Sequence, residues 1–204
     1  MRKIIKEKFP NILLGIYGFF FLILAFSPYN RIYWIASNLS PVIIIFFLVK
    51  NFAGYRFSNL SYLLASIFIF LQTLGSHYFF YNVHIDFITD LFQFNRNNFD
   101  RLVHFSVGLY AFLIAEYLMR RKMVNQIFIV YLFAFFAIMT VAALYEILEW
   151  IFVIVYSPGS NVDLLGAQGD IWDAQKDMLC DGIGAILSLL LFRLLNKKLL
   201  LLKE

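Results

Sequence analysis

The feature that most constrains the fold is an apolar stretch over residues 124–155, in which Glu146 and Glu149 are the only charged residues. About 20 apolar residues are enough for a helix to cross the hydrocarbon core of a bilayer, so this stretch predicts a transmembrane helix. Hydrocarbon tolerates carboxylates only when they are neutralised, hydrated or paired. The two glutamates therefore indicate a functional site, and a second group of acids follows them in residues 170–181.

The composition supports a membrane protein over the whole chain. Hydrophobic residues make up 62% of the 204 residues and charged residues 15%, whereas about a quarter of a soluble domain is charged. No internal repeat or long linker interrupts the sequence, which predicts a single transmembrane domain over residues 1–204. The one cysteine, Cys180, excludes an intramolecular disulfide and a cluster of thiolate metal ligands.

Six apolar segments are long enough, or nearly long enough, to cross the bilayer. They are residues 12–26, 32–49, 62–81, 102–119, 124–155 and 177–195. With residue 1 in the cytoplasm, all of the 17 Lys and Arg residues fall in cytoplasmic segments except Arg31, Arg96, Arg101 and Lys176, as the positive-inside rule requires. The sequence thus predicts an all-α polytopic bundle of about six transmembrane helices with both termini cytoplasmic. Its expected partner is the lipid bilayer and not nucleic acid.

The acids of the last predicted span share one helix face. Four aspartates form this stripe: Asp170, Asp173, Asp177 and Asp181. At about 100° per residue they fit within an arc of roughly 80°. Gly184 and Ser188 continue the stripe, which allows a neighbouring helix to approach closely beside the acids. The aspartates and every histidine fall on the predicted outer side of the membrane, so we expect an outward-facing cluster of acids and histidine.

Two further helices turn polar groups toward the same side, because Glu146 and Glu149 lie about 60° apart and Asp100 and His104 about 40° apart. The candidate catalytic residues are Asp100, His104, Glu146, Glu149, Asp173 and Asp177. The candidate substrate-binding residues are His77, Arg101, Gln168, Asp170, Trp172 and Lys176. Helix capping by the first aspartates and an interfacial position for Trp172 are the structural alternatives.

The excess of carboxylates over nearby positive charge indicates a bound cation. Only Arg101 and Lys176 lie close in the predicted topology, and crowded carboxylates repel unless an ion neutralises them or some are protonated. Mixed oxygen and imidazole ligands suit manganese, zinc or magnesium. The candidate metal ligands are His104, Glu146, Glu149, Asp173 and Asp177. A network of protonated carboxyls that share hydrogen bonds is the alternative.

Four segments resemble the YjdF-type inner-membrane proteins of bacteria. They are LGSHYFFYNV (74–83), RNNFDRLVHFSVG (96–108), YEILEW (145–150) and LGAQGDIWDAQKDM (165–178), and the similarity covers roughly residues 55–195. The resemblance implies a multi-pass protein of the bacterial inner membrane. It implies no reaction.

A weaker similarity is to VanZ-like membrane proteins, which combine a D-x-x-x-H-F helix, an acid-bearing helix and a D-x-x-D-x-x-x-N helix. The matching residues are Asp100, His104 and Phe105, then Glu146 and Glu149, then Asp170, Asp173 and Asp177. Asp177 stands where those proteins have asparagine, and the arginine usually found upstream has no equivalent. These departures argue against a glycopeptide-resistance role.

Three classes of function are open. The first is an intramembrane enzyme that acts on an envelope lipid or lipid-linked precursor from the outer face, using a divalent ion or a carboxyl group as general acid. The second is a structural, assembly or stress-response protein in which the polar cluster joins helices. The third is a proton- or cation-coupled transporter, although a pathway across the membrane needs polar steps toward the cytoplasm, where Glu116 stands alone.

Overall fold

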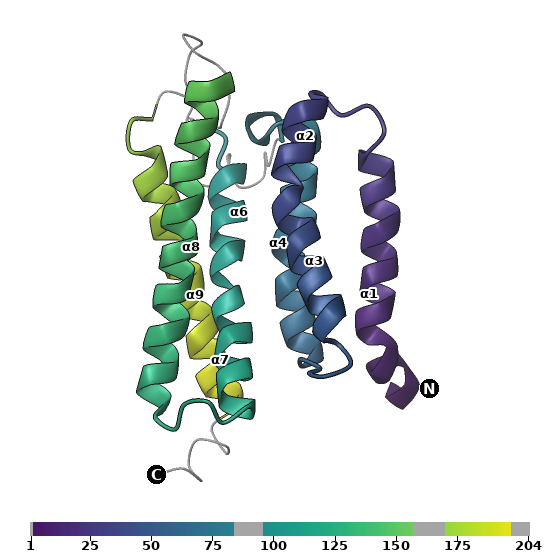
Figure 1. Cartoon of the computed structure of the whole chain (residues 1–204), viewed down its shortest axis with the longest axis vertical. Coiled ribbons are helices and arrows are strands. Elements are labelled where there is room, and N and C mark those ends of the chain that lie inside the picture. The colour runs from purple at the N-terminus through teal and green to yellow at the C-terminus, as the bar shows by residue number, and fades with distance from the viewer. Residues whose placement is uncertain (1, 84–95, 157–169, 197–204) are drawn as a thin grey trace. The chain divides into compact units, whose positions relative to one another are not determined.

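The computed structural model describes residues 2–83, 96–156 and 170–196, and every regular element among them is helical (Figure 1). The elements are α1 (Arg2–Leu24), α2 (Arg31–Ser37), α3 (Leu39–Asn51), α4 (Asn59–Tyr78), the 3-10 turn η1 (Phe80–Asn82), α6 (Phe99–Gly108), α7 (Tyr110–Arg120), α8 (Ile127–Tyr156) and α9 (Asp173–Leu195). The prediction of an all-α polytopic membrane protein is confirmed.

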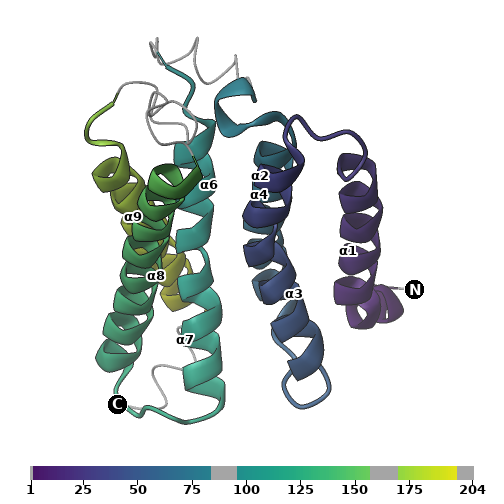
Figure 2. The same cartoon turned by 45° about the horizontal axis from the view of Figure 1, so that its top comes forward.

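Within these described ranges, five helical segments are long and apolar enough to cross a membrane. They are Arg31–Asn51, Asn59–Tyr78, Phe99–Arg120, Ile127–Phe152 and Asp173–Leu195. These segments correspond to the second to sixth predicted spans. The first predicted span falls on α1, whose apolar part, Lys8–Leu24, is shorter. Two of the five segments are pairs of helices in line, and Figures 1 and 2 show α2 leading into α3 and α6 leading into α7.

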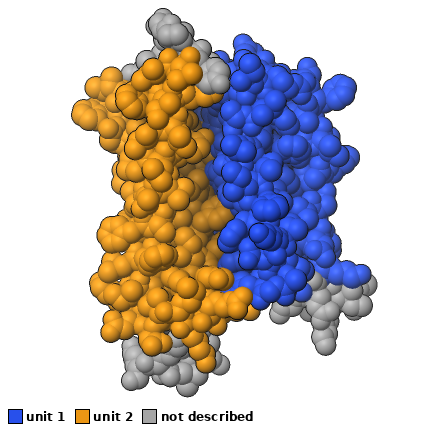
Figure 3. Space-filling view, viewed as in Figure 1, with its two compact units in different colours: residues 1–99 blue, residues 100–204 orange. Residues whose placement is uncertain are grey.

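The chain comprises two compact units, residues 1–99 and residues 100–204, which Figure 3 shows in different colours. Unit 1 contains α1 to α4, and unit 2 contains α7 to α9 with nearly all of α6. A single transmembrane domain over residues 1–204 and the cytoplasmic position of both termini stay predictions.

Unit 1 is held together by a buried amide at the joint between α2 and α3. The side-chain nitrogen of Asn38 donates to the carbonyl of Trp34 at 2.8 Å and to the hydroxyl of Ser76 at 2.6 Å. Its side-chain oxygen accepts from Thr73 at 2.8 Å, and the Thr73 hydroxyl lies 2.9 Å from that of Tyr17. Because hydrocarbon offers these groups no other partners, the network fixes α1, α2 and α3 against α4.

In unit 2, α6 approaches α9 backbone to backbone. A Cβ atom on Gly184 would collide with the carbonyl oxygen of Phe105, and one on Gly108 would collide with the backbone of Asp181. The Ser188 hydroxyl donates to the carbonyl of Gly108 at 3.2 Å. The prediction that Gly184 and Ser188 admit a neighbouring helix is confirmed, and that neighbour is α6. Helices α7, α8 and α9 also pack against one another.

Candidate functional site

The predicted polar residues of unit 2 meet where α6 and α9 begin and where α8 carries its glutamates. The buried face of α8 repeats every four residues through Val130, Ala134, Ile138 and Ala142. Glu146 is the next position in this series, so the same face that packs inside unit 2 delivers a carboxylate. Four buried side chains of α6 and α9 form the rest of this polar group. We call Asp100, His104, Glu146, Asp177 and Asp181 the acid–histidine cluster.

His104 is the centre of the cluster. Its Nδ1 atom lies 3.0 Å from Oδ2 of Asp181, and its Nε2 atom lies 3.7 Å from Oε1 of Glu146 and 3.8 Å from Oδ1 of Asp100. The Tyr145 ring packs edge-on against the imidazole, with 5.8 Å between ring centroids. A carboxylate on Nδ1 favours a proton there, which leaves the lone pair of Nε2 for a ligand or for a proton.

Arg101, a residue of α6, contacts the first turns of α9. Its Nη2 atom is 2.5 Å from Oδ1 of Asp173 and 3.4 Å from Oδ2 of Asp170. Its Nη1 atom donates to the Asp173 carbonyl at 2.9 Å and also forms an ion pair with Asp177. The Lys176 ammonium lies 2.6 Å from Oδ2 of Asp170. The nearby positive charge is therefore engaged at the N-terminal end of α9, where it faces Asp170 and Asp173 as well as the cluster.

Asp170 lies before α9, outside the candidate spans. The hydrogen bond from Lys176 lowers the pKa of its carboxyl below the usual value, and the backbone N–H of Trp172 acts in the same direction. This carboxylate therefore stays ionised. Asp170 thus contacts Arg101, Lys176 and the backbone N–H of Trp172, and these groups form a small polar cluster just before α9.

The cluster is enclosed by protein. Asp100, His104 and Asp177 are 7%, 5% and 2% exposed, and Asp181 is fully buried. Among the described residues, Oδ1 of Asp181 and Oε1 of Glu146 find no hydrogen-bond partner. Buried oxygens of this kind are costly unless a proton or a cation occupies them.

One set of three residues is close enough together to hold a metal ion. Asp100, His104 and Asp177 each offer a ligand atom, and these atoms lie within 4.8 Å of one another. Ligands on opposite sides of an ion are about 4 Å apart for magnesium and nearly 5 Å apart for calcium. The three atoms are thus close enough to share one ion.

The structure brings some of the predicted site residues together and separates others. Asp100, His104, Glu146, Asp173 and Asp177 meet in unit 2, and Glu149 lies one turn farther along α8 at intermediate exposure.

Two of the other predicted substrate-binding residues are described outside the contacts of the acid–histidine cluster, and a third is not described. His77 belongs to unit 1, where its Nδ1 atom lies 2.7 Å from the carbonyl oxygen of Leu24. Trp172 is 58% exposed at the N-terminal end of α9. Gln168 lies outside the described residues.

The list of candidate site residues omits two members of this region. Among the described ion pairs of His104, the one with Asp181 is the shortest. Tyr145 packs edge-on against the imidazole ring. Asp181 follows Asp177 by one helical turn, so its place in the stripe was the available signal. Nothing in the spacing singles out Tyr145.

Comparison with known proteins agrees with this membrane architecture. The family model described as "Predicted membrane protein (DUF2238)" matches residues 9–198. The chain belongs to this family. It is similar to the inner membrane protein YjdF of Escherichia coli strain K12, with 29% identity over 162 residues that cover 78% of this chain and 77% of that protein. No solved structure matches the chain.

Membership of the DUF2238 family confirms the YjdF-type resemblance. The five candidate spans, the family and the inner-membrane relative confirm a multi-pass inner-membrane protein. Its environment is therefore the lipid bilayer.

Proposed function

We propose that this protein is a membrane-embedded enzyme that binds a divalent cation at Asp100, His104 and Asp177. Its substrate is the polar group of an envelope lipid or of a lipid-linked precursor, taken from the outer face of the membrane. The observation that carries the proposal is the convergence of three buried ligand atoms within 4.8 Å.

The surroundings of the three ligands support a cation. Asp181 contacts Nδ1 of His104 at 3.0 Å, the arrangement by which a carboxylate fixes the ring of a metal-binding histidine. Glu146 adds a further buried oxygen 3.7 Å from Nε2. Mixed carboxylate and imidazole ligands suit manganese, zinc or magnesium. Such an ion supplies an activated water or a clamp for a phosphate oxygen.

The position of the cluster supports an enzyme rather than a transporter. It lies where α6 and α9 begin, while the contact of these helices at Gly108 and Gly184 lies farther along both. Backbone atoms in contact leave no space for an ion path between these two helices. A site that is closed on one side and polar on the other favours chemistry at one membrane face.

A second function, a structural lock between helices, is favoured by Arg101. Its guanidinium joins α6 to Asp173 and Asp177 of α9. In this alternative, the acids and the arginine hold the helices in register for membrane assembly, and no ion is required.

Metal analysis separates the two functions. We expect protein purified without chelator, or reloaded with manganese, zinc or magnesium, to hold about one ion per chain. An ion at about 100 times its dissociation constant adds about 2.7 kcal/mol of stability, which raises the melting temperature. Asp100→Asn should abolish both effects, while Glu116→Gln, a change of a buried acid on α7, should keep them. If no ion is bound and added divalent metal leaves the melting temperature unchanged, the structural lock between helices is favoured.

Turnover is tested on the same samples. Metal-loaded protein is reconstituted in vesicles of bacterial envelope lipids, and released head groups are followed by mass spectrometry. The wild type and Glu116→Gln should release product, and Asp100→Asn should not. Metal binding without any lipid turnover would contradict the enzymatic part of the proposal.

A further inference from the structure

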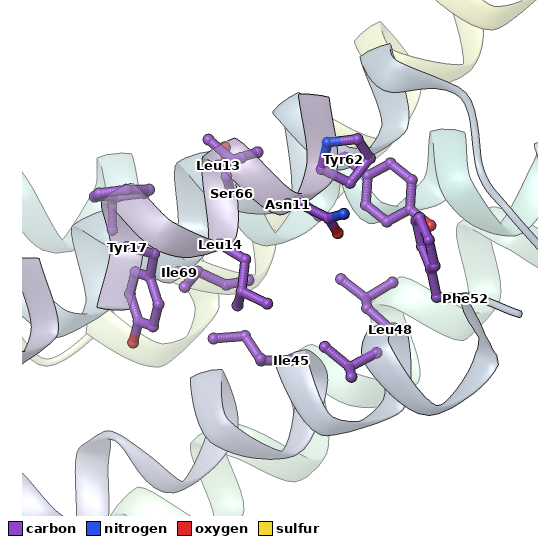
Figure 4. Close-up of a pocket in the computed structure, with 14 residues that line it drawn as sticks. Asn11, Leu13, Leu14, Tyr17, Ile45, Leu48, Phe52, Tyr62, Ser66 and Ile69 are labelled. Carbon is purple, nitrogen blue, oxygen red and sulfur yellow. The ribbon is translucent and has the colours of Figure 1, made fainter. Parts of the chain in front are cut away.

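An apolar groove in unit 1 is unrelated to the acid–histidine cluster of unit 2. It lies between α1 and α3, which both pack against α4. Figure 4 shows Leu14 of α1 and Ile45 and Leu48 of α3 directed toward one space, with Ile69 of α4 behind it. The cavity volume is about 150 Å³.

The size and lining of the groove suit a hydrocarbon chain. An apolar cavity of about 150 Å³ stays dry and accepts a hydrocarbon ligand such as benzene. The lining runs along α1 from Pro10 to Tyr17, which corresponds to about 10 Å of helix. Because α3 and α4 are candidate membrane spans, acyl chains are the molecules that surround this groove.

One basic side chain contacts the lining at one end of the groove, and two other basic residues are close to lining residues in the sequence. The lining includes Val49 and Phe52 at the end of α3, and the Arg56 guanidinium lies over the Phe52 ring, 5.3 Å from its centroid. Lys50 follows Val49 directly, and Lys8 precedes the lining residue Pro10 by two positions. This end is the one that the positive-inside rule places in the cytoplasm.

We propose that the groove binds one acyl chain of an anionic phospholipid from the cytoplasmic leaflet, with the phosphate near Arg56 and Lys50. The apolar walls hold the chain, and the basic end selects the charge of the head group. A basic residue near an anionic lipid surface contributes roughly a fivefold gain in affinity. The proposal is independent of the metal site, since it involves other residues in the other unit.

The test measures lipid retained by the purified protein. Native mass spectrometry after exchange into phosphatidylglycerol or phosphatidylcholine should show one tightly held phosphatidylglycerol, retained about fivefold or more over phosphatidylcholine. Leu48→Trp fills the groove and should abolish retention, whereas Phe47→Trp, at a neighbouring position that is 61% exposed, should not. Arg56→Gln should lower the preference about fivefold, and Lys122→Gln in unit 2 should leave it unchanged.

If Leu48→Trp does not fold, photolabelling of the wild-type protein tests the proposal instead. Phosphatidylglycerol with a photoreactive group in its acyl chain should label wild-type protein within residues 10–17, 45–52 and 62–70. Equal retention of both lipids, or labelling that avoids these ranges because another segment or a second copy fills the groove, would overturn the proposal.

Discussion

The imidazole of His104 and the carboxylate of Asp181 lie 3.0 Å apart and join α6 to α9 inside unit 2. This contact decides which ring nitrogen is available to the other acids, because Nε2 faces Asp100 and Glu146. Asp181 thus acts on the site through His104, although it is not one of the three proposed ligands.

The first prediction concerns this positioning carboxylate. Asp181→Asn keeps the shape of the side chain but weakens its hold on Nδ1, so the affinity for the divalent ion should fall about 10–100-fold. Titration of the metal-dependent melting temperature measures the change. Ser188→Ala, farther along α9 and buried, is the matched control. Equal affinities in wild type and Asp181→Asn would show that Asp181 does not orient the ring for a metal.

Arg101 supplies the second prediction. Arg101→Ala leaves Asp173 and Asp177 without their shared guanidinium, and loss of one partner of a buried ion pair costs about 3–5 kcal/mol. Unfolding in a detergent titration should show the loss. Arg121→Ala, an exposed residue of the α7–α8 turn, should cost less than about 1 kcal/mol. Similar losses for both variants would contradict a structural role for the arginine.

The third prediction compares two glycine positions. Gly184→Ala places a methyl group against the Phe105 carbonyl, and a forced contact of this kind typically costs about 1–3 kcal/mol. Gly18→Ala meets no atom within 4 Å on α1, so it should be neutral or stabilise the helix by up to about 1 kcal/mol. The melting temperatures of the two variants are compared with that of the wild type. An unchanged melting temperature for Gly184→Ala would contradict the close contact between α6 and α9.

The fourth prediction is a pH dependence at the start of α9. The lowered pKa of Asp170 means that its contact with Lys176 stabilises the fold above the ordinary aspartate pKa of about 3.9. That contribution is lost as the pH falls through the lower folded-state value. The wild type should therefore melt above Asp170→Asn at about pH 6, and the difference should narrow below about pH 4. A constant difference would assign the effect to something other than ionisation.

The fifth prediction is the orientation in the membrane. Reporter fusions after Asn82 should report the outer compartment, and fusions after Arg121 and Asn196 should report the cytoplasm. An outer signal after Arg121 would place the start of α6 and α9, and with it the acid–histidine cluster, toward the cytoplasm.

Hydropathy was sufficient to predict the five candidate spans, because each long helix must present apolar side chains to lipid along most of its length. The aspartate stripe and the small residues after it also predicted the close approach of another helix, since α-helical spacing fixes which side chains share a face. The four-residue repeat that carries Glu146 is a pattern of burial on α8, and it became visible only in the structure because the segment is apolar on all sides.

The partners of the polar groups required the structure. Spacing within α6 shows that Asp100 and His104 share a face, but not that Asp181 is the carboxylate nearest the imidazole. His77 illustrates the same difficulty, because its position in the sequence does not indicate that its ring contacts the carbonyl of Leu24. Pairing between helices depends on their rotation and depth, which a single helix sequence does not specify.

Asn38 has a consequence for how the chain enters the membrane. Synthesis delivers Arg31–Asn51 before Thr73 and Ser76, so on arrival in the bilayer the Asn38 amide has the Trp34 carbonyl of its own segment and lacks its other partners. A polar group in hydrocarbon without those partners favours retention at a hydrated insertion site. We therefore expect the segment Arg31–Asn51 to be released into lipid together with α4, as a helical hairpin, rather than one helix at a time.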